Sequence, residues 1–300
     1  MDNNLAGIYI DAETGERTEF TKDDKPIILT EKDRHKQAEL RDKQKKALQK
    51  ENKVFFMKDY NKEISGSFIF MIYRYCKSKK DLTQADLTRL IYLASFVTYE
   101  GILTFDNRTV LTKQNLNQLV LKLHKETFYT FYNKIVKLKI IEEKEDKLYL
   151  NKAHFFKGFP AEHKKFILKR NYIRIYIDAI QHLYKNTPVK NHKQLGIIFM
   201  LIPFINRYWN ILCTNPDEQN LELLNILTLD NLAAILGYNK KYLFQLKKEL
   251  KKIKLADGKN VLIFIEKDID SNKKEICINP KIIYGDSEPE YAFKVMEKYF

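Results

Sequence analysis

Hydrophobic and polar positions alternate in the same way in two stretches of the chain, residues 127–140 and 242–255. Each stretch carries four apolar residues at the 3-4-3 spacing of one helical face. These are Phe128, Phe131, Ile135 and Leu138 in the first stretch, and Leu243, Leu246, Leu250 and Ile253 in the second. The second set follows the first by 115 positions. The pattern therefore predicts two amphipathic helices that belong to one internal repeat.

The neighbours of these two helices also correspond. A shorter helix is predicted before each of them, with Thr112 and Thr228 as the N-cap residues. After each of them, two short strand-like runs around a polar tip predict a β-hairpin. A closing segment then begins with Asn151 in the first copy and Asn279 in the second. Helix, helix and hairpin in this order are typical of a winged helix-turn-helix, so the sequence predicts two such modules.

The remaining segments predict further elements. Alternating runs on both sides of a Thr-Gly turn predict a β-hairpin over residues 8–20. A helix is predicted over residues 31–50, which are rich in lysine, arginine and glutamate; it is either a solvated helix or a basic arm that follows phosphates. Apolar spacing predicts helices over residues 68–77, 84–99 and 161–186, the last of them long and basic.

Together these elements predict an α+β fold that is predominantly helical. It consists of tandem winged helix-turn-helix domains with an N-terminal β-hairpin and a basic helix. We expect an N-terminal arm, two winged-helix domains and a short tail. The predicted boundaries are residues 1–62, 63–160, 161–285 and 286–300.

Net charge narrows the choice of partner. The chain has 300 residues, a formal net charge of +14 and a pI near 9.3, which favour a polyanionic partner such as DNA, RNA or an acidic membrane surface. A lysine-rich solvated surface is the alternative explanation of this charge. With 44% hydrophobic residues the chain has the composition of a soluble globular protein and not of a disordered one.

Cysteine and histidine positions indicate neither disulfides nor metal. Cys76, Cys213 and Cys277 lie far apart in apolar surroundings, which predicts reduced, buried thiols and a cytoplasmic location. The six histidines do not cluster with them, so we expect no metal and no cofactor. The N-terminus does not resemble a targeting peptide, and the most apolar run, residues 195–205, is too short to span a bilayer. No membrane association is expected.

Several segments carry a family resemblance. Ser-Gly-Ser-Phe at residues 65–68, Leu-Lys-Ile-Ile-Glu-Glu at 138–143 and Leu-Tyr-Leu-Asn-Lys at 148–152 resemble firmicute plasmid replication proteins of the RepL type. The plan of two units is similar to the wider class of plasmid and phage replication initiators with tandem winged helices. The resemblance covers about half of the chain, and its motifs are structural. It implies binding to origin DNA and contact with host replication proteins.

The outward face of the first amphipathic helix is a candidate for reading DNA. Its polar and cationic residues are Lys125, Thr127, Tyr129, Thr130, Asn133 and Lys137. Asn133 has the side chain that reads an adenine edge, and Thr130 has a methyl group that contacts thymine. The lysines would contact phosphates.

The second helix presents a more cationic face. Its candidate residues are Lys240, Lys241, Tyr242, Gln245, Lys248 and Lys252. Gln245 corresponds to Thr130, and Lys248 corresponds to Asn133. We therefore expect this copy to contribute more phosphate affinity and less base discrimination. The alternative is that both faces are ordinary solvated helix surfaces.

The two hairpin tips differ in charge. The first carries the acidic residues Glu142, Glu143, Glu145 and Asp146, which phosphates would repel, so it is expected to face protein or solvent. The second carries Lys273 and Lys274 and is better suited to a phosphate or to the minor groove.

No set of residues indicates catalysis. The chain contains neither a phosphate-binding glycine loop nor a dinucleotide fingerprint, and its histidines show no triad spacing, so no enzyme activity is expected. The leading hypothesis is a sequence-specific double-stranded DNA-binding protein that initiates replication of a plasmid or phage. The alternatives are a winged-helix transcriptional regulator of a mobile element and, from another class, a protein-interaction adaptor. A homodimer remains an open alternative to a monomer.

Overall fold

The structure is a computed structural model, and it divides the chain into two compact units, Met1–Phe55 and Phe56–Phe300. The residues that it describes are 5–10, 17–21, 35, 38–44, 66–72, 82–106, 108–163, 172–266, 274–285, 294–295 and 298–300.

The first unit contains the predicted N-terminal hairpin. Strands β1 (Leu5–Ile10) and β2 (Arg17–Thr21) pair antiparallel, with Ile8 opposite Glu19. His35 and residues 38–44 are helical and exposed, so the described part of the predicted basic segment is a helix without a buried face. The apolar run Val-Phe-Phe-Met at residues 54–57 also predicts a strand, and it lies outside the described residues.

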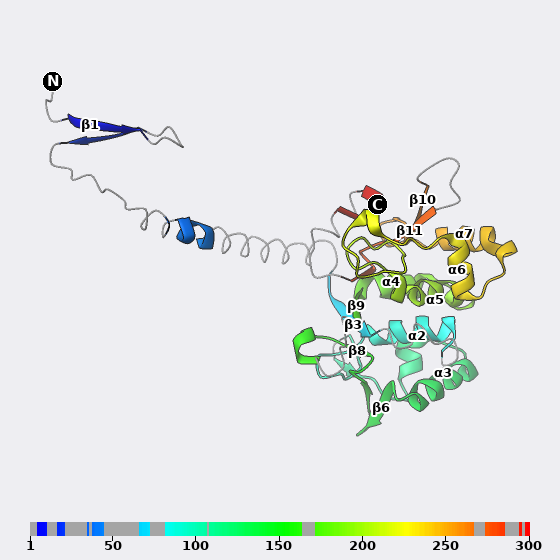
Figure 1. Ribbon diagram of the computed structural model, residues 1–300. Helices are drawn as coiled ribbons and strands as arrows, with labels where there is room; N and C mark the ends of the chain where they lie inside the picture. Colours follow the sequence, from blue (N-terminus) through cyan, green and yellow to red (C-terminus); the bar gives the residue numbers. More distant parts are fainter. Residues whose placement is uncertain are drawn as a thin grey trace. The chain divides into compact units, whose positions relative to one another are not determined.

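The second unit mixes helices with small antiparallel sheets (Figure 1). Its first half contains β3 (Phe68–Ile72), α2 (Gln84–Ala94), β4 (Thr104–Phe105), β5 (Thr109–Val110), the π-helix η3 (Asn117–Leu121), α3 (Lys125–Lys137), β6 (Ile141–Lys144), β7 (Lys147–Leu150) and β8 (Phe155–Phe156). Its second half contains the 3₁₀ turn η4 (Pro160–His163), β9 (Tyr172–Tyr176), α4 (Ile177–Asn186), η5 (Val189–Asn191), α5 (His192–Met200), η6 (Ile202–Phe204), η7 (Leu221–Leu223), α6 (Leu229–Leu236), η8 (Lys240–Tyr242), α7 (Leu243–Lys251), β10 (Leu262–Glu266), β11 (Lys274–Ile278) and β12 (Ile283–Tyr284).

A four-stranded antiparallel sheet joins the two halves, in the order β12-β9-β3-β8. Phe70 of β3 lies opposite Arg174 of β9. On its other side Phe70 lies opposite Phe156, and Arg174 lies opposite Tyr284. The sheet therefore has an approximate two-fold axis at the Phe70–Arg174 pair, which exchanges β3 with β9 and β8 with β12.

Two predicted helices are wrong because of this sheet. Residues 68–72 of the predicted helix over 68–77 form β3, and residues 172–176 of the predicted helix over 161–186 form β9. Five successive apolar residues, Phe-Ile-Phe-Met-Ile, suit a central strand that is covered on both faces as well as they suit a helix. The distant partner strands decide between the two. The end of the second predicted helix is confirmed as α4.

Helix α2 starts as predicted and ends early. The Thr83 hydroxyl accepts a hydrogen bond from Asp86 N at 3.2 Å, and Asp86 Oδ2 accepts one from Thr83 N at 3.1 Å, which forms a capping box. The helix ends at Ala94 and not at residue 99, because Val97 pairs with Leu103 in an antiparallel bridge.

Helices α2 and α5 pack against each other between α3 on one side and α7 on the other (Figure 1). The Thr88 hydroxyl of α2 donates a hydrogen bond to His192 O at 2.8 Å. A Cβ atom on Gly196 of α5 would lie only 1.9 Å from Gln84 O. Helix α5 starts 108 positions after α2. At this offset Gln84 corresponds to His192 and Thr88 corresponds to Gly196, so the two contacts join corresponding pairs of residues. This packing is therefore two-fold as well, and it requires glycine at position 196.

Corresponding turns in the two halves make the same hydrogen bonds. Asn151 Nδ2 donates to Lys139 O at 3.0 Å, and Asn279 Nδ2 donates to Asn260 O at 3.0 Å. In both copies the asparagine Oδ1 accepts a bond from the backbone N–H two residues later. Thr112 and Thr228 each exchange reciprocal hydrogen bonds with the asparagine three residues later. Thr228 is confirmed as the N-cap of α6. The predicted N-cap at Thr112 is wrong, because its bonds with Asn115 close a turn before η3, which begins at Asn117 with Leu116 in the N-cap position.

The two predicted winged-helix domains, residues 63–160 and 161–285, thus contribute strands to one sheet and pack through α2 and α5. Their boundaries remain predictions. Of the predicted buried thiols, Cys213 and Cys277 are buried, and burial raises the pKa of Cys213 to about 11. Cys76 lies outside the described residues. No helix in the described part of the chain combines the length and apolarity that a membrane crossing requires.

Candidate nucleic-acid interface

Helix α3 buries one face in the core and exposes the other. The predicted inner residues Phe128, Phe131 and Ile135 are buried, Leu138 packs against the core just after the helix, and Tyr132 is buried beside them. On the opposite face Lys125, Tyr129, Thr130, Asn133 and Lys137 are exposed, and Thr127 is half-buried. Apart from Thr127, the candidate residues of this copy therefore lie on solvent-exposed surface.

Two polar contacts hold α3 in place. The Tyr132 hydroxyl donates to Glu143 Oε2 at 3.2 Å and ties the helix to β6. Burial, followed by the charge of Glu143, raises the pKa of Tyr132 to about 12, so the hydroxyl keeps its proton at neutral pH. Lys134 Nζ lies 2.6 Å from Asp86 Oδ2 and ties α3 to α2.

Strands β6 and β7 form the hairpin that follows α3. Glu145 and Asp146 have φ of 50° and 58°, the left-handed conformation of a tight two-residue hairpin turn. The hairpin is as predicted, and Glu143, Glu145 and Asp146 are exposed at and near its tip. Lys144 Nζ and Glu142 Oε2 lie 2.6 Å apart, so one lysine is already paired with a carboxylate of this hairpin.

The second copy is built in the same order. Thr228 caps α6, and Gly237 ends it with φ of 67°, which favours glycine. The 3₁₀ turn η8 then leads into α7, where Leu246 and Leu250 are buried. Helix α7 spans 9 residues and α3 spans 13, so the second copy buries a shorter helix.

The outward face of α7 is exposed, but part of it is occupied internally. Lys241, Tyr242, Gln245, Lys248 and Lys252 are exposed. Gln245 Nε2 donates to Glu249 Oε1 at 3.1 Å, and Lys252 Nζ lies 2.8 Å from the same oxygen. Lys241 and Lys248 are therefore better placed than Gln245 and Lys252 to contact a ligand.

Three predicted lysines have no described side-chain position. Lys273 lies outside the described residues, and only the backbone of Lys240 and Lys274 is described. Strands β10 and β11 confirm the second hairpin, with Phe264 opposite Ile276, while its tip at residues 267–273 is outside the described residues.

Phe244 is an exposed aromatic side chain on α7 that was not among the predicted site residues. Phe244 on α7 is 80% exposed, the most exposed large hydrophobic side chain among the described residues. Lys248 and Lys251 follow it by one and two helical turns and are exposed on the same side. Phe244 corresponds to Tyr129 at the offset of 115 positions, and Tyr129 is 43% exposed. Because Tyr129 is a predicted site residue, the same offset would have added Phe244 to the predicted face of α7.

The described residues contain no group of histidine, cysteine, aspartate and glutamate side chains that could hold a metal ion. No protein-family model, curated protein or solved structure matches the chain.

Proposed function

We propose that this chain is a sequence-specific double-stranded DNA-binding protein, in which α3 and α7 are the recognition helices of two winged helix-turn-helix modules. Each helix follows a shorter helical segment and precedes an antiparallel hairpin. A helix of this kind fits the width of the major groove.

The observation that carries the proposal is the pair of exposed polar faces on α3 and α7. Both faces carry lysines, and the chain has a net charge of +14. Binding to the DNA phosphate backbone requires such cationic side chains. On α3, Asn133 and Thr130 add side chains that can read base edges. The face of α7 offers lysines and aromatic rings, since its Gln245 is bonded to Glu249.

We further propose that the DNA is the replication origin of a plasmid or phage and that host replication proteins are recruited to it. This step rests on the resemblance to RepL-type proteins and on the two-unit plan. It predicts direct repeats in or beside the gene, whereas a transcriptional regulator predicts an inverted repeat at a promoter. A plasmid that carries the gene and its flanking DNA should replicate only with the intact gene.

A salt titration tests DNA binding directly. We expect Lys125→Ala, Lys137→Ala, Lys241→Ala and Lys248→Ala to weaken binding to duplex DNA. Each change should reduce the slope of log K against log salt concentration by about 0.9 when its lysine contacts one phosphate. Gel shift or fluorescence anisotropy at several salt concentrations measures both quantities.

Lys185→Ala and Lys190→Ala provide a matched control, because these lysines are exposed and lie on and after α4. They should leave the affinity and the salt slope nearly unchanged. An unchanged slope in the four test variants would remove α3 and α7 from the interface.

The acidic hairpin β6–β7 supports a second candidate, a protein-interaction adaptor. Its exposed carboxylates Glu143, Glu145 and Asp146 would be repelled by phosphate and suit a basic protein surface. An adaptor predicts no salt-sensitive DNA binding by the intact chain. The titration above therefore separates the two candidates.

A further inference from the structure

The two-fold relation within the second unit pairs each residue of the α2–α3 junction with one of the α5–α7 junction. Asp86 is the third residue of α2, and Gln194 is the third residue of α5. Lys134 of α3 corresponds, at the offset of 115 positions, to Glu249 of α7. The two junctions can therefore be compared position by position.

In the first half the junction is closed by an ion pair. Lys134 Nζ lies 2.6 Å from Asp86 Oδ2, and Arg89 Nη1 lies 3.3 Å from Asp86 Oδ1. Asp86 is only 5% exposed, so water screens these interactions little. Burial raises the pKa of Asp86, but the hydrogen bonds from Lys134 and Thr83 outweigh it and lower the pKa below its usual value. The carboxylate is thus charged and joins α2 to α3.

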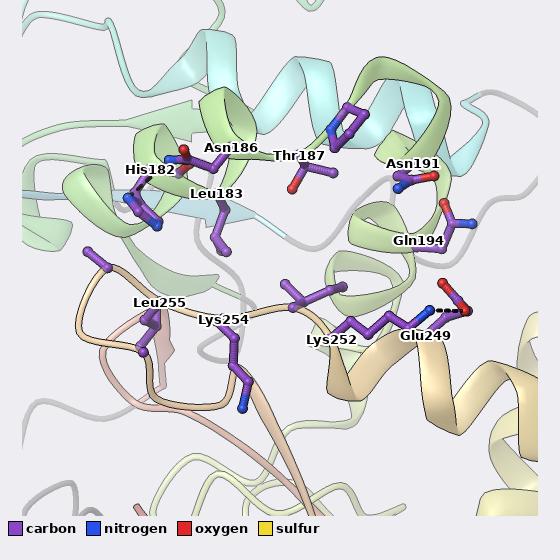
Figure 2. Close-up of a pocket in the computed structure, with 14 residues that line it drawn as sticks. His182, Leu183, Asn186, Thr187, Asn191, Gln194, Glu249, Lys252, Lys254 and Leu255 are labelled. Atoms are coloured by element: carbon purple, nitrogen blue, oxygen red, sulfur yellow. Dashed lines mark hydrogen bonds and ion pairs between the residues drawn. The ribbon is translucent and has the colours of Figure 1, made fainter.

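In the second half the corresponding residues cannot form this contact, because Gln194 is neutral and Glu249 is acidic. Glu249 instead pairs within α7, with Lys252 and Gln245. Gln194 Oε1 is buried, and no hydrogen-bond donor of the described residues reaches it. Both side chains line a cavity of about 430 Å³ between α4, α5 and the end of α7. Figure 2 shows Gln194 and Glu249 on opposite walls of this cavity.

The hydrophobic contacts differ in the same direction. Four side chains of α3 are buried, namely Phe128, Phe131, Tyr132 and Ile135. Only Leu246 and Leu250 are buried on α7. Helix α3 is therefore fixed by a larger buried face and by a cross-helix ion pair, and α7 has less of both.

We propose that Asp86 and Lys134 are positioning residues that hold α3 in a fixed orientation for reading bases, and that α7, without this ion pair, adjusts to the DNA backbone. The inference rests on the proposed DNA binding and assigns sequence discrimination to the first half. Readout of base edges requires side chains placed to within a fraction of an ångström, whereas lysine–phosphate contacts tolerate displacement.

Hydrogen exchange tests the positioning without any DNA. In the full chain, Lys134→Met should speed amide exchange in α3 by about tenfold and leave α7 nearly unchanged. Lys134→Arg keeps the charge and should restore slow exchange. Unchanged exchange in the Lys134→Met variant would overturn the proposal, whether or not the protein binds DNA.

DNA binding then tests discrimination. A duplex enriched from a random-sequence pool serves as the specific probe, and the unselected pool serves as the non-specific probe. Lys134→Met should lower the ratio of specific to non-specific affinity by about tenfold, mainly because binding to the specific probe becomes weaker. Lys134→Arg should restore the ratio. An equal loss for both probes would mean that Lys134 acts only through stability or charge, and this result would overturn the assignment.

The second half offers a gain-of-function test that does not depend on destabilising the first. The double variant Gln194→Asp with Glu249→Lys transfers the ion pair to the α5–α7 junction. We expect slower amide exchange in α7 than in the wild type. Glu249→Lys alone is the matched control, because it has no new carboxylate partner and should not slow exchange. Equal exchange in the double variant and the control would contradict the role of the pair.

If the wild type binds neither probe, the proposed function fails, while both exchange experiments still decide whether the pair positions its helix. Binding without any loss of discrimination in Lys134→Met leaves the proposed function in place and removes this inference.

Discussion

His192 shows how burial changes the chemistry of a single side chain. Its ring lies 4.4 Å from that of Tyr184, and its Nε2 donates to Thr187 O at 3.2 Å. Burial and, next, the charge of Arg89 lower its pKa from 6.5 to about 4. The imidazole is therefore neutral in the folded protein at neutral pH, which suits a structural role and not proton transfer.

This pKa predicts a pH dependence of stability. Between pH 6.5 and 4 the unfolded state binds the His192 proton and the folded state does not, so the free energy of unfolding falls as the pH is lowered through this window. His192→Phe keeps a ring beside Tyr184 but removes the titration. Urea unfolding at several pH values should show a weaker dependence in this variant. Parallel plots of the free energy of unfolding against pH for the wild type and the variant would contradict the lowered pKa of His192. The other histidines contribute equally to both plots, so their effect cancels in the comparison.

Asn133 and Lys137 are both exposed on α3 and should behave differently if the helix lies in the major groove. Asn133→Ala should cost about 1–3 kcal/mol on one preferred base pair and relax the preference there. Lys137→Ala should weaken binding to all sequences alike and reduce the salt slope. Binding measured on single-base variants of the selected duplex separates the two effects. Equal effects on all base variants from both changes would argue against base reading by Asn133.

At the scale of elements, the asparagine turn after each hairpin is hydrogen-bonded to the segment just before the hairpin's first strand. Asn279 is fully buried, whereas Asn151 is half-buried, although their hydrogen bonds correspond. A buried group that loses its partner cannot turn to water. The same turn should therefore contribute more to stability in the second half than in the first.

Alanine substitution tests this difference. Asn279→Ala should lower the free energy of unfolding by about 2 kcal/mol, since it leaves Asn260 O and Lys281 N without their side-chain partner. Asn151→Ala should cost about 1 kcal/mol, because water can reach the exposed groups. Denaturant unfolding measures both. A larger loss from Asn151→Ala would contradict the argument from burial.

Within the second unit as a whole, the sheet and the α2–α5 pair make the two halves depend on each other. The halves correspond to predicted domains, but β3 pairs with β9 and Gly196 packs on Gln84 O. We therefore expect this unit to unfold in one cooperative transition and not in two.

Gly196→Ala tests this coupling. The added Cβ would meet Gln84 O at 1.9 Å, a backbone atom that cannot move without shifting α2. The free energy of unfolding should fall by about 3 kcal/mol, and amide exchange should rise in both α3 and α7. Calorimetry and hydrogen exchange provide these measurements, with Lys185→Ala on the exposed side of α4 as the control. Faster exchange in only one half of the Gly196→Ala variant would show that the Gly196–Gln84 contact does not couple the halves.

The sequence by itself determined the amphipathic helices, the Thr228 cap, both hairpins and the asparagine turns. These depend on contacts between residues close in the chain, so spacing and residue type suffice. The candidate face of α3 followed from the same periodicity. The contacts of Gln245 and Lys252 with Glu249 and the high exposure of Phe244 could not be predicted in this way, because they depend on which side chains are neighbours on the folded surface.

Only the tertiary structure decided that residues 68–72 and 172–176 are strands. A short apolar run fits either a buried strand or a helix, and the choice came from partners about one hundred positions away in the chain. The Asp86–Lys134 pair likewise joins residues that no sequence pattern connects. Local residue patterns thus specify the helices and hairpins of each half, while long-range hydrogen bonding and packing around the two-fold axis decide how the halves fit together and how α3 and α7 are held.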